Sequence, residues 1–318
     1  MRYLIAGAGA IGAYIGARMA AAGEDVTLFA RGAHLEAMLA RGVRVQSPDG
    51  EFHAQPKIIG KLEAAGPVDV VILGVKAHGL TELAPKLKPL LSGDTVVVST
   101  QNGVPWWYFD GLERVDPGCV IARAIEPERV LGSIVYFSTD VPEPGLIRHT
   151  EGNRISLGEP DGTRSDRGRE IGDALNRAGF RCRVTSHIRQ EIWVKILGNV
   201  AFNPISALTR ATLAQMTADP EISNLVRSIM TEAEAVATAL GMELPVSIEQ
   251  RIAGAAKVGD HKTSMLQDLE LGRPLELEAI VGAVVELGER VGVPMPCTRA
   301  VYGCARLLDQ ITRVARHS

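Results

Sequence analysis

The feature that most constrains this chain is a glycine-rich turn that begins at its seventh residue. A short apolar run at 3–6 leads into the turn, and an alanine-rich stretch at 11–22, closed by Gly23, follows it. A buried strand, a tight turn and a helix in this order predict the start of a dinucleotide-binding βαβ unit. The turn has the pattern GxGxxG and consists of Gly7, Ala8, Gly9, Ala10, Ile11 and Gly12.

Each glycine of the turn has its own physical role. Gly7 permits the tight turn, Gly9 lets the backbone approach a pyrophosphate, and Gly12 lets the helix pack closely on the strand. The exposed amides at the start of the helix then favour the phosphate charge. A glycine-rich turn without a ligand is the alternative, but the strand–turn–helix context favours a dinucleotide site.

The end of the second expected strand indicates which dinucleotide is bound. NAD sites usually carry an acidic residue about 20 residues after the loop, where it holds the ribose 2′-hydroxyl. Here the strand at 25–29 is followed by Ala30 and Arg31, with no carboxylate. Because a guanidinium can hold a 2′-phosphate and stack on adenine, Arg31 predicts NADP (NADPH) as the cofactor. A solvated surface arginine is the alternative.

Two further polar groups follow predicted strands in this half of the chain. Lys76 comes after the strand at 68–73, and Gln101-Asn102-Gly103 comes after the strand at 95–99, with a helix expected at 80–91. Open α/β sheets bind ligands at the carboxyl ends of their strands, so both groups should flank the cofactor crevice. A surface lysine and an ordinary Asn-Gly turn are the alternatives.

The pattern of expected elements changes along the chain. Strands at 133–138 and 154–157 extend the sheet, whereas strand signals almost vanish after Ser186. We therefore predict an α/β fold, in which a Rossmann-type doubly wound sheet (1–186) is followed by an all-helical C-terminal domain (187–318). Helical periodicity is seen at 187–202, 219–240, 246–259, 275–292 and 296–315.

The first of these helices carries a polar row on its apolar face. Lys195, Asn199 and Asn203 repeat every four residues, in steps of about 6 Å along the axis. A buried ammonium and two buried amides are unfavourable unless they have partners, and a polar substrate is one such partner. Desolvation would also lower the pKa of the lysine toward a value useful for proton transfer. Alternatively, the row contacts the neighbouring domain or faces water. Pro204 is expected to bend or end the helix.

A second polar set lies downstream. A polar stretch at 261–268, which includes Ser264, precedes an expected helix, and Glu276 stands among apolar residues. Glu276 could be the buried partner of a lysine. A surface glutamate near a helix start, where acids are common, is the alternative.

Composition limits the classes of partner. The formal net charge of −3 over 318 residues gives no electrostatic reason to expect nucleic acid or an anionic membrane. The four cysteines form no CxxC pair and no cluster with zinc-ligand spacing, so we expect reduced thiols and no metal site. With no apolar run of membrane-spanning length and no signal peptide pattern, we expect a cytoplasmic protein of two domains.

Taken together, these motifs resemble those of the ketopantoate reductase (2-dehydropantoate 2-reductase) family, and the resemblance covers nearly the whole chain. The lysine–asparagine–asparagine–proline run and the spacing from Ser264 to Glu276 are its most specific parts. The residues that carry it are 7–12, Lys76, 101–103, 145–150, 195–204 and 264–276.

The resemblance implies NADPH-dependent reduction of ketopantoate, a 2-oxo acid, to pantoate in pantothenate biosynthesis. It implies that Lys195 protonates the carbonyl oxygen and that Glu276 orients Lys195. It further implies that Asn102, Asn199, Asn203 and Ser264 bind the substrate. Cofactor contacts are implied for the glycine loop, Arg31, Lys76, Asn102 and Glu276.

Two departures from the family leave the substrate open. An aromatic run at 106–109 follows Asn102-Gly103, and Leu213 stands where a polar substrate-side residue is expected. The aromatic run could be a pocket wall, the contact of a homodimer or a packed loop. The remaining alternatives are reduction of another 2-oxo acid at the same site, and a non-catalytic NADP-binding sensor.

Overall fold

A mixed sheet dominates the first half of the chain. In the computed structural model, which describes residues 1–314, ten strands form it, in the order β4-β3-β9-β8-β7-β6-β1-β2-β5, with β10 beside β9. The strands are β1 (Arg2–Ala6), β2 (Asp25–Phe29), β3 (Val43–Ser47), β4 (Gly50–Ala54), β5 (Lys57–Ile59), β6 (Val70–Leu73), β7 (Val96–Ser99), β8 (Val130–Glu143), β9 (Leu146–Gly158) and β10 (Arg181–Val184).

The parallel centre of this sheet determines where a ligand can bind. Strand β1 pairs with β2 on one side and with β6 on the other, and β6 pairs with β7, all in parallel. The strand order therefore reverses between β1 and β6. Their carboxyl ends lie at one edge, since Ala6 is in register with Phe29 and Leu73, and Leu73 with Ser99. A topological switch point of this kind is where open α/β sheets bind ligands.

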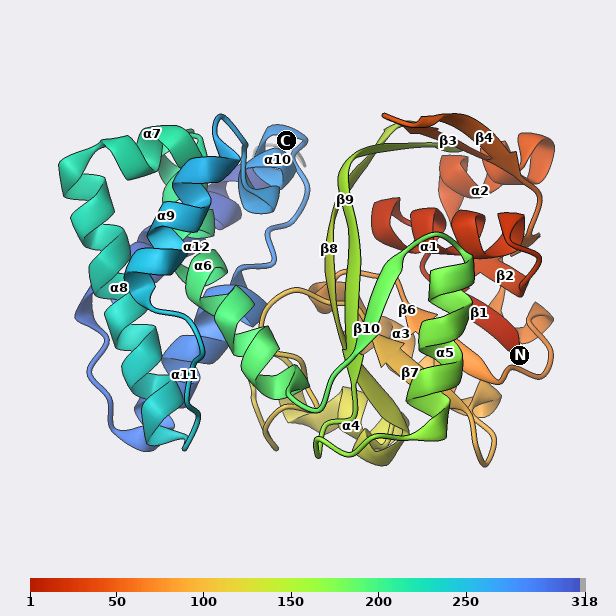
Figure 1. Ribbon diagram of the computed structural model, residues 1–318, viewed down its shortest axis with the longest axis horizontal. Helices are drawn as coiled ribbons and strands as arrows, with labels where there is room; N and C mark the ends of the chain where they lie inside the picture. The colour runs from red at the N-terminus through yellow and green to blue at the C-terminus, as the bar shows by residue number, and fades with distance from the viewer. Residues whose placement is uncertain (315–318) are drawn as a thin grey trace. The chain divides into compact units, whose positions relative to one another are not determined.

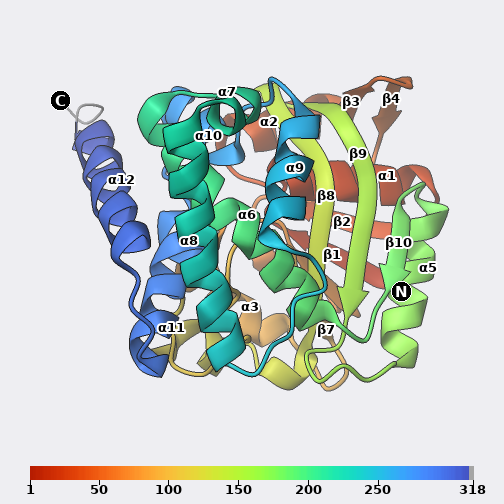
Figure 2. The same cartoon turned by 60° about the vertical axis from the view of Figure 1, so that its left-hand side comes forward.

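Five α-helices accompany the sheet in the described residues before Ser186. Figure 1 shows α1 and α5 next to each other, and residues of both contribute to one apolar core with the strands. The long strands β8 and β9 form an antiparallel pair that is prominent in Figure 2. The helices are α1 (Ala10–Ala21), α2 (Gly32–Arg41), α3 (Leu80–Leu87), α4 (Val120–Ala124) and α5 (Asp166–Arg177).

The described residues after Ser186 contain helices and no strand. Helix α8 packs against α7, α9, α11 and α12. Helices α7 and α9 begin with capping boxes, in which Thr212 pairs with Gln215 and Ser247 with Gln250. The helices are α6 (Ile188–Thr209), α7 (Leu213–Ala218), α8 (Pro220–Ala239), α9 (Ile248–Val258), α10 (Ser264–Glu270), α11 (Ala283–Val291) and α12 (Pro296–Val314), with a π-helical segment at Glu278–Gly282.

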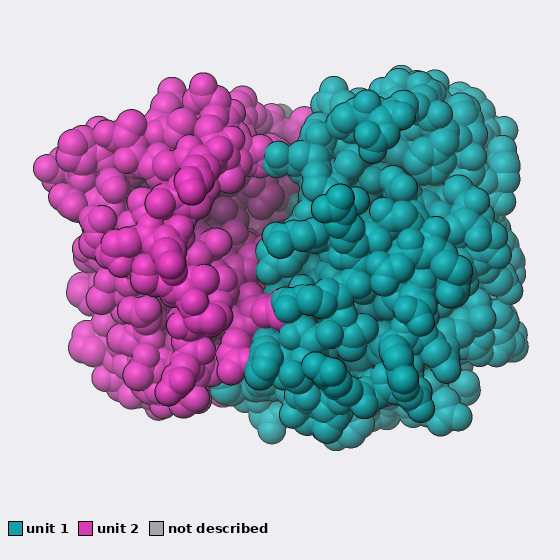
Figure 3. Space-filling view, viewed as in Figure 1, with its two compact units in different colours: residues 1–101, 106–110, 118–189 teal, residues 102–105, 111–117, 190–318 magenta. Residues whose placement is uncertain are grey.

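The chain divides into two compact units, coloured in Figure 3, and we describe each by itself. Unit 1 consists of Met1–Gln101, Trp106–Asp110 and Gly118–Arg189. Unit 2 consists of Asn102–Pro105, Gly111–Pro117 and the chain from Gln190 onward. Two short segments from the first half of the sequence therefore belong to the helical unit.

The predicted fold class is confirmed. Pro204 was expected to bend or end its helix, and an end at this residue is wrong, because α6 continues through it to Thr209. The Thr209 hydroxyl donates to the carbonyl of Ile205, and the Ser206 hydroxyl donates to that of Ala211. These side chains bind backbone carbonyls of the last turn and of the chain just beyond it.

Candidate active site

The glycine-rich turn has the geometry that its sequence predicts. Gly7 has a φ of +109°, and a Cβ there would lie 2.4 Å from Cγ1 of Val75. A Cβ on Gly12 would lie 2.2 Å from the carbonyl oxygen of Gly7. Both positions therefore accept only glycine, the first for its backbone conformation and the second because α1 rests directly on the turn.

Gly9 differs from its two neighbours, since its missing side chain leaves open space. The only contact that a Cβ there would make is with the Gly74 carbonyl oxygen, 3.9 Å away. Within the described residues, no side chain caps the start of α1 and its first turn holds no acidic residue. An uncapped helix N-terminus behind an open glycine suits the pyrophosphate of a dinucleotide, so the residues present fit this cofactor.

Arg31 lies at the carboxyl end of β2, directly before α2. Its side chain is 60% exposed, and its nearest carboxylate oxygen, from Glu82, is 3.5 Å away. Glu82 in turn forms a closer pair with Lys86 at 2.6 Å. An exposed pair of this length contributes little to stability, so the guanidinium can turn toward a phosphate at small cost.

Lys76 lies two residues beyond Gly74, in the segment that follows β6. It occupies the N-cap position of a short 3₁₀ turn at Ala77–Gly79. The residues leading to it are packed on the glycine loop, since a Cβ on Gly74 would lie 2.3 Å from the carbonyl oxygen of Gly7. Unit 1 therefore brings the glycine loop, the end of β2 and the end of β6 to one edge of its sheet.

The remaining predicted site residues belong to unit 2. Lys195, Asn199 and Asn203 lie in one row along α6. Lys195 and Asn199 are partly buried, and Asn203 is only 4% exposed. Within residues 1–314, the buried Nδ2 of Asn203 has no hydrogen-bond partner. An unsatisfied buried amide is costly for stability, and a polar ligand would remove that cost.

The electrostatics of Lys195 set it apart from a surface lysine. Desolvation by burial lowers the pKa of Lys195 to about 8, while the nearby carboxylate of Glu276 acts in the opposite direction. Glu276 itself is 8% exposed. The two residues therefore form a charged pair inside unit 2. The pKa of the ammonium group lies close to neutral pH.

Asn102 is carried into unit 2 by a tight backbone contact. The amide of Val104 donates to the carbonyl of Ala279 at 2.8 Å. A Cβ on Gly103, which has a φ of +85°, would lie 2.2 Å from that same oxygen. Ala279 belongs to the π-helical segment that begins two residues after Glu276, so Asn102 and Glu276 lie on segments in direct contact.

The π-helical segment was not predicted from the sequence. π-Helical turns are rare and occur frequently at functional sites. Periodicity indicated only a continuous helix from 275 to 292, and no local signal marks the change of winding at Glu278–Gly282. In the sequence, Asn102-Gly103 indicated only a turn, whereas the structure gives Gly103 a positive φ at its close contact with Ala279.

Ser264 lies on the exposed surface at the first turn of α10. The preceding Thr263 is the N-cap residue, and its side chain accepts from the amide of Leu266. The Ser264 hydroxyl is therefore not required for capping. Within residues 1–314, no contact joins Ser264 to Lys195 or Glu276.

The aromatic run is a packed loop of unit 1. Trp106, Trp107 and Tyr108 are at most 5% exposed. The indole of Trp107 donates to Oγ of Ser99, and the hydroxyl of Tyr108 donates to the carbonyl of Arg189 at 2.7 Å. Rings buried in this way cannot form the face of a dimer contact.

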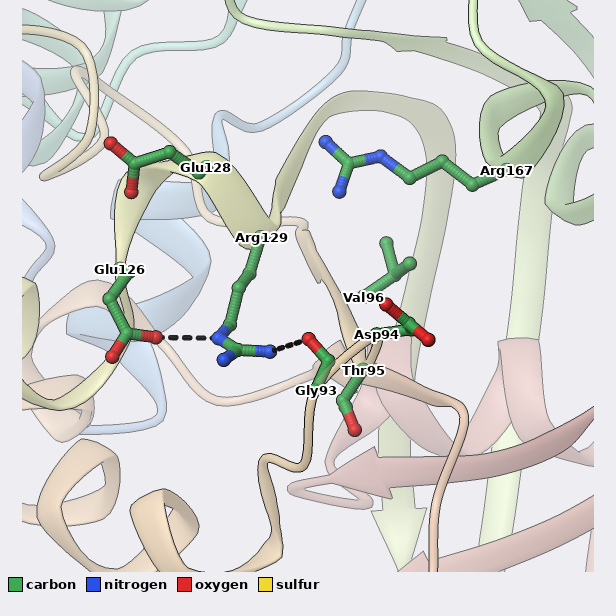
Figure 4. A pocket seen from close by; sticks show the side chains of 8 residues that line it. All are labelled: Gly93, Asp94, Thr95, Val96, Glu126, Glu128, Arg129 and Arg167. Carbon is green, nitrogen blue, oxygen red and sulfur yellow. Dashed lines mark hydrogen bonds and ion pairs between the residues drawn. The ribbon is translucent and has the colours of Figure 1, made fainter.

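A cavity of about 470 Å³ lies at the opposite end of the sheet, where β7 begins (Figure 4). Its guanidinium groups are already satisfied: Arg129 binds Glu126 at 2.5 Å and the Gly93 carbonyl at 2.6 Å, and Arg167 binds Glu159 at 2.5 Å. This cavity is therefore not where the predicted residues gather. Its lining residues are Gly93, Asp94, Thr95, Val96, Glu126, Glu128, Arg129 and Arg167.

The described residues contain neither a candidate metal centre nor a helix that could cross a membrane. Among residues 1–314, no group of three or more His, Cys, Asp and Glu side chains is arranged to hold a metal ion. No helix in that range combines the length and the apolar character that crossing a membrane requires.

A Rossmann-type sheet with an open phosphate loop, followed by helices that bury a lysine–glutamate pair, defines the class of dinucleotide-dependent oxidoreductases. The family follows from comparison. A family model described as "Ketopantoate reductase PanE/ApbA" matches residues 3–162, and its C-terminal counterpart matches residues 187–309. The chain belongs to the ketopantoate reductase family.

Individual relatives agree with this assignment. A 2-dehydropantoate 2-reductase of Mesorhizobium japonicum is 49% identical, over 97% of this chain and 98% of that protein. A solved structure from Ralstonia solanacearum MolK2, provisionally described as a ketopantoate reductase, is 40% identical with a TM-score of 0.93 over 98% of each chain. A D-mandelate dehydrogenase, solved with NADH and anilino(oxo)acetate, shares the fold at 21% identity and a TM-score of 0.88, over 98% of this chain and all of that one.

Proposed function

We propose that this chain reduces 2-dehydropantoate to pantoate with NADPH, and that Lys195 is the general acid. In this proposal, residues 1–186 bind the cofactor and residues 187–318 supply the catalytic and substrate-binding groups. The names of its relatives support the substrate, because the 49% identical protein is a 2-dehydropantoate 2-reductase.

The observation that carries the proposal is the ammonium group of Lys195. With a pKa of about 8 it is mostly protonated at neutral pH, yet it gives up its proton far more readily than an ordinary lysine. A catalytic acid works best when its pKa lies near the operating pH. The carboxylate of Glu276 keeps the pKa from falling further, which retains the proton for transfer.

The chemistry divides between the cofactor and the chain. When bound, NADPH supplies the hydride that adds to the carbonyl carbon of the 2-oxo acid. Lys195 donates its proton to the carbonyl oxygen, which becomes the 2-hydroxyl, and the positive charge stabilises the oxygen before that transfer is complete. Glu276 orients the ammonium group and holds its charge.

The polar residues near Lys195 are proposed to bind the substrate. The unpaired Nδ2 of Asn203 is a buried donor suited to a carbonyl or hydroxyl oxygen. We assign Asn199 and Asn102 to the same side of the substrate, with Asn102 also reaching the cofactor together with Glu276. Ser264 is assigned to the carboxylate.

NADPH is proposed over NADH because of Arg31. The end of β2 carries a guanidinium and no carboxylate, which suits a 2′-phosphate and offers nothing to a ribose 2′-hydroxyl. Lys76 is assigned to the part of the cofactor that lies over the end of β6.

The decisive experiment is a substrate panel. NADPH oxidation would be measured with ketopantoate, with smaller aliphatic 2-oxo acids and with an aromatic 2-oxo acid, using Lys195→Ala as the inactive control. We expect the highest kcat/KM for ketopantoate. An equal or higher value for the aromatic acid would overturn the substrate assignment. Binding of NADPH without oxidation on any member would indicate the sensor instead of the reductase.

A further inference from the structure

The side chain of Gln101 joins the ends of two neighbouring strands. It extends from the residue pair that follows β7, and its Nε2 donates to the carbonyls of Leu73 and Val75, both at 2.9 Å. Leu73 is the last residue of β6, and Val75 lies in the connection toward Lys76. Gln101 therefore clamps the backbone on both sides of Gly74.

The chemistry of these contacts fixes which way the amide points. Both partners are backbone carbonyls, which only accept hydrogen bonds, so the nitrogen of Gln101 must face them. The Oε1 atom then points away from the clamp. This oxygen is buried and has no hydrogen-bond partner within residues 1–314.

The clamped backbone is in contact with the phosphate loop. A Cβ on Gly74 would lie 2.3 Å from the carbonyl oxygen of Gly7 and 2.8 Å from Cα of Gly12. Gly7 in turn has no room for a Cβ because Val75 fills that space. A shift of Gly74 and Val75 would therefore displace the loop, because closely packed backbone segments cannot move independently of each other.

We propose that Gln101 is a positioning residue of the dinucleotide site. Its Nε2 atom holds the end of β6 against the phosphate loop. Its Oε1 atom is available to accept a hydrogen bond from the bound nucleotide. The inference rests on the proposed function, because it assumes that this edge of the sheet binds NADP. It assigns Gln101 a role that neither the loop pattern nor the lysine–asparagine row contains.

The test compares variants that keep the shape of the side chain. Gln101→Met removes the donor and the acceptor at nearly constant volume. Gln101→Glu keeps the shape but turns a carboxylate oxygen toward two carbonyl oxygens. The dissociation constant of NADP⁺ would be measured by calorimetry on folded protein, with the melting temperature recorded for each variant. We expect Kd to rise about tenfold or more in both variants, since buried backbone carbonyls lose their donor.

Thr100→Val is the matched control. Its hydroxyl donates to the same Leu73 carbonyl at 2.6 Å, but it leaves the Val75 contact and the Oε1 atom untouched. We expect its Kd to change by less than about twofold. In steady-state reduction with Gln101→Met, the KM for NADPH should rise while kcat at saturating NADPH stays close to that of the wild type.

Three results would overturn the inference. They are an unchanged Kd in Gln101→Glu, an equal loss in Thr100→Val, and a lower melting temperature at unchanged NADP⁺ affinity. Failure of the proposed function looks different. If the NADP assignment fails, the unaltered protein binds no NADP⁺, and if the substrate assignment fails, only the substrate panel changes and NADP⁺ binding stays intact.

Discussion

At the scale of single residues, the lysine of α6 departs clearly from its ordinary chemistry. A lysine in water keeps its proton well beyond physiological pH, whereas burial brings the pKa of Lys195 to about 8. Burial of the charge is unfavourable, and it lets the lysine release its proton at a lower pH than an exposed lysine would. The proposed role of Lys195 can therefore be tested by measuring kcat, the affinity for NADPH and the pH dependence of the reaction.

Replacement of this lysine should separate chemistry from cofactor binding. In Lys195→Ala, we expect kcat to fall by about two to four orders of magnitude, the range for loss of a general acid. The Kd for NADPH should stay within about twofold, because the residues proposed to hold its phosphates lie in unit 1. Lys257→Ala, on the exposed face of α9, is the control. A parallel loss of NADPH binding would remove Lys195 from proton transfer.

The pH profile should report the same group. The acid is active only when protonated, so kcat/KM for reduction should be level below pH 8 and fall as the pH rises through about 8. Glu276→Gln removes the charge that raises the pKa of Lys195, so the fall should begin at lower pH. A profile that does not move in this variant would show that Glu276 does not act on the titrating group.

The proposed preference for NADPH over NADH also depends on one side chain. Arg31→Ala should lower the ratio of kcat/KM for NADPH over NADH by about tenfold or more, the worth of a charge-assisted hydrogen bond. Stability should hardly change, because Arg31 is exposed and its pair with Glu82 is long. Arg41→Ala, at the other end of α2, is the matched control. An unaltered ratio in Arg31→Ala would mean that another residue selects the phosphate.

At the scale of elements, the strand–turn–helix unit of β1 and α1 places two glycines under different demands. Gly12 is closed in by the backbone of the turn, whereas a Cβ on Gly9 would lie 3.9 Å from its nearest neighbour among residues 1–314, the Gly74 carbonyl oxygen. The first glycine is required for packing, and the second is proposed to admit the pyrophosphate. The two demands can be separated because a methyl group fits at one position and clashes at the other.

Alanine at these two positions should give opposite results. Gly12→Ala places a Cβ 2.2 Å from the Gly7 carbonyl oxygen, so we expect a loss of about 1–3 kcal/mol in the free energy of unfolding. Gly9→Ala should melt like the wild type, since its φ of −76° suits alanine, but bind NADP⁺ at least about tenfold more weakly. Denaturant unfolding and calorimetry together test the pair. Equal stability of the two variants would contradict the predicted clash between a Cβ at position 12 and the Gly7 carbonyl oxygen.

The elements that the sequence predicts best are those with a single strong pattern. The strands β1, β2, β6 and β7 are largely buried and mostly apolar, and they lie within two residues of where they were predicted. The strands β3, β4 and β5 were missed, because exposed and partly exposed residues interrupt their apolar pattern. Helix α5 was missed because few of its residues are apolar.

The site divides in the same way between local and distant contacts. The glycine loop and the row on α6 are local patterns, readable from spacing alone. The contact of Gly103 with Ala279 and the clamp of Gln101 on Leu73 and Val75 are not. Both contacts join segments that are far apart in sequence, and both use backbone carbonyls. Because every residue type has a backbone carbonyl, the sequence does not indicate which ones take part in such contacts.

At the scale of the whole molecule, the two units are interleaved along the sequence. Asn102–Pro105 and Gly111–Pro117 fold with the helices, although the residues around them fold with the sheet. Glu286 accepts from the amides of Glu113 and Arg114, and the side chain of Arg290 donates to the carbonyl of Gly111. The helical unit is therefore incomplete without these segments.

A fragment that begins at Gln190 should not fold to a native helical unit. It would lack the amide that binds the Ala279 carbonyl and both amides that bind Glu286. We expect loss of a cooperative thermal transition, with the helical far-ultraviolet signal partly retained. The intact chain, measured by the same circular dichroism melt, is the control. A sharp transition in the fragment would show that the two segments are dispensable.

The interleaving also limits how such a protein can evolve. A single crossover between two homologous genes at the start of α6 would join the helices of one parent to the 102–117 region of the other. The glycine at 103 and the carbonyl at 279 would then come from different ancestors, as would the amides at 113 and 114 and their carboxylate. Exchange of the two units between such genes is therefore disfavoured, because the backbone of one parent would have to fit the helices of the other.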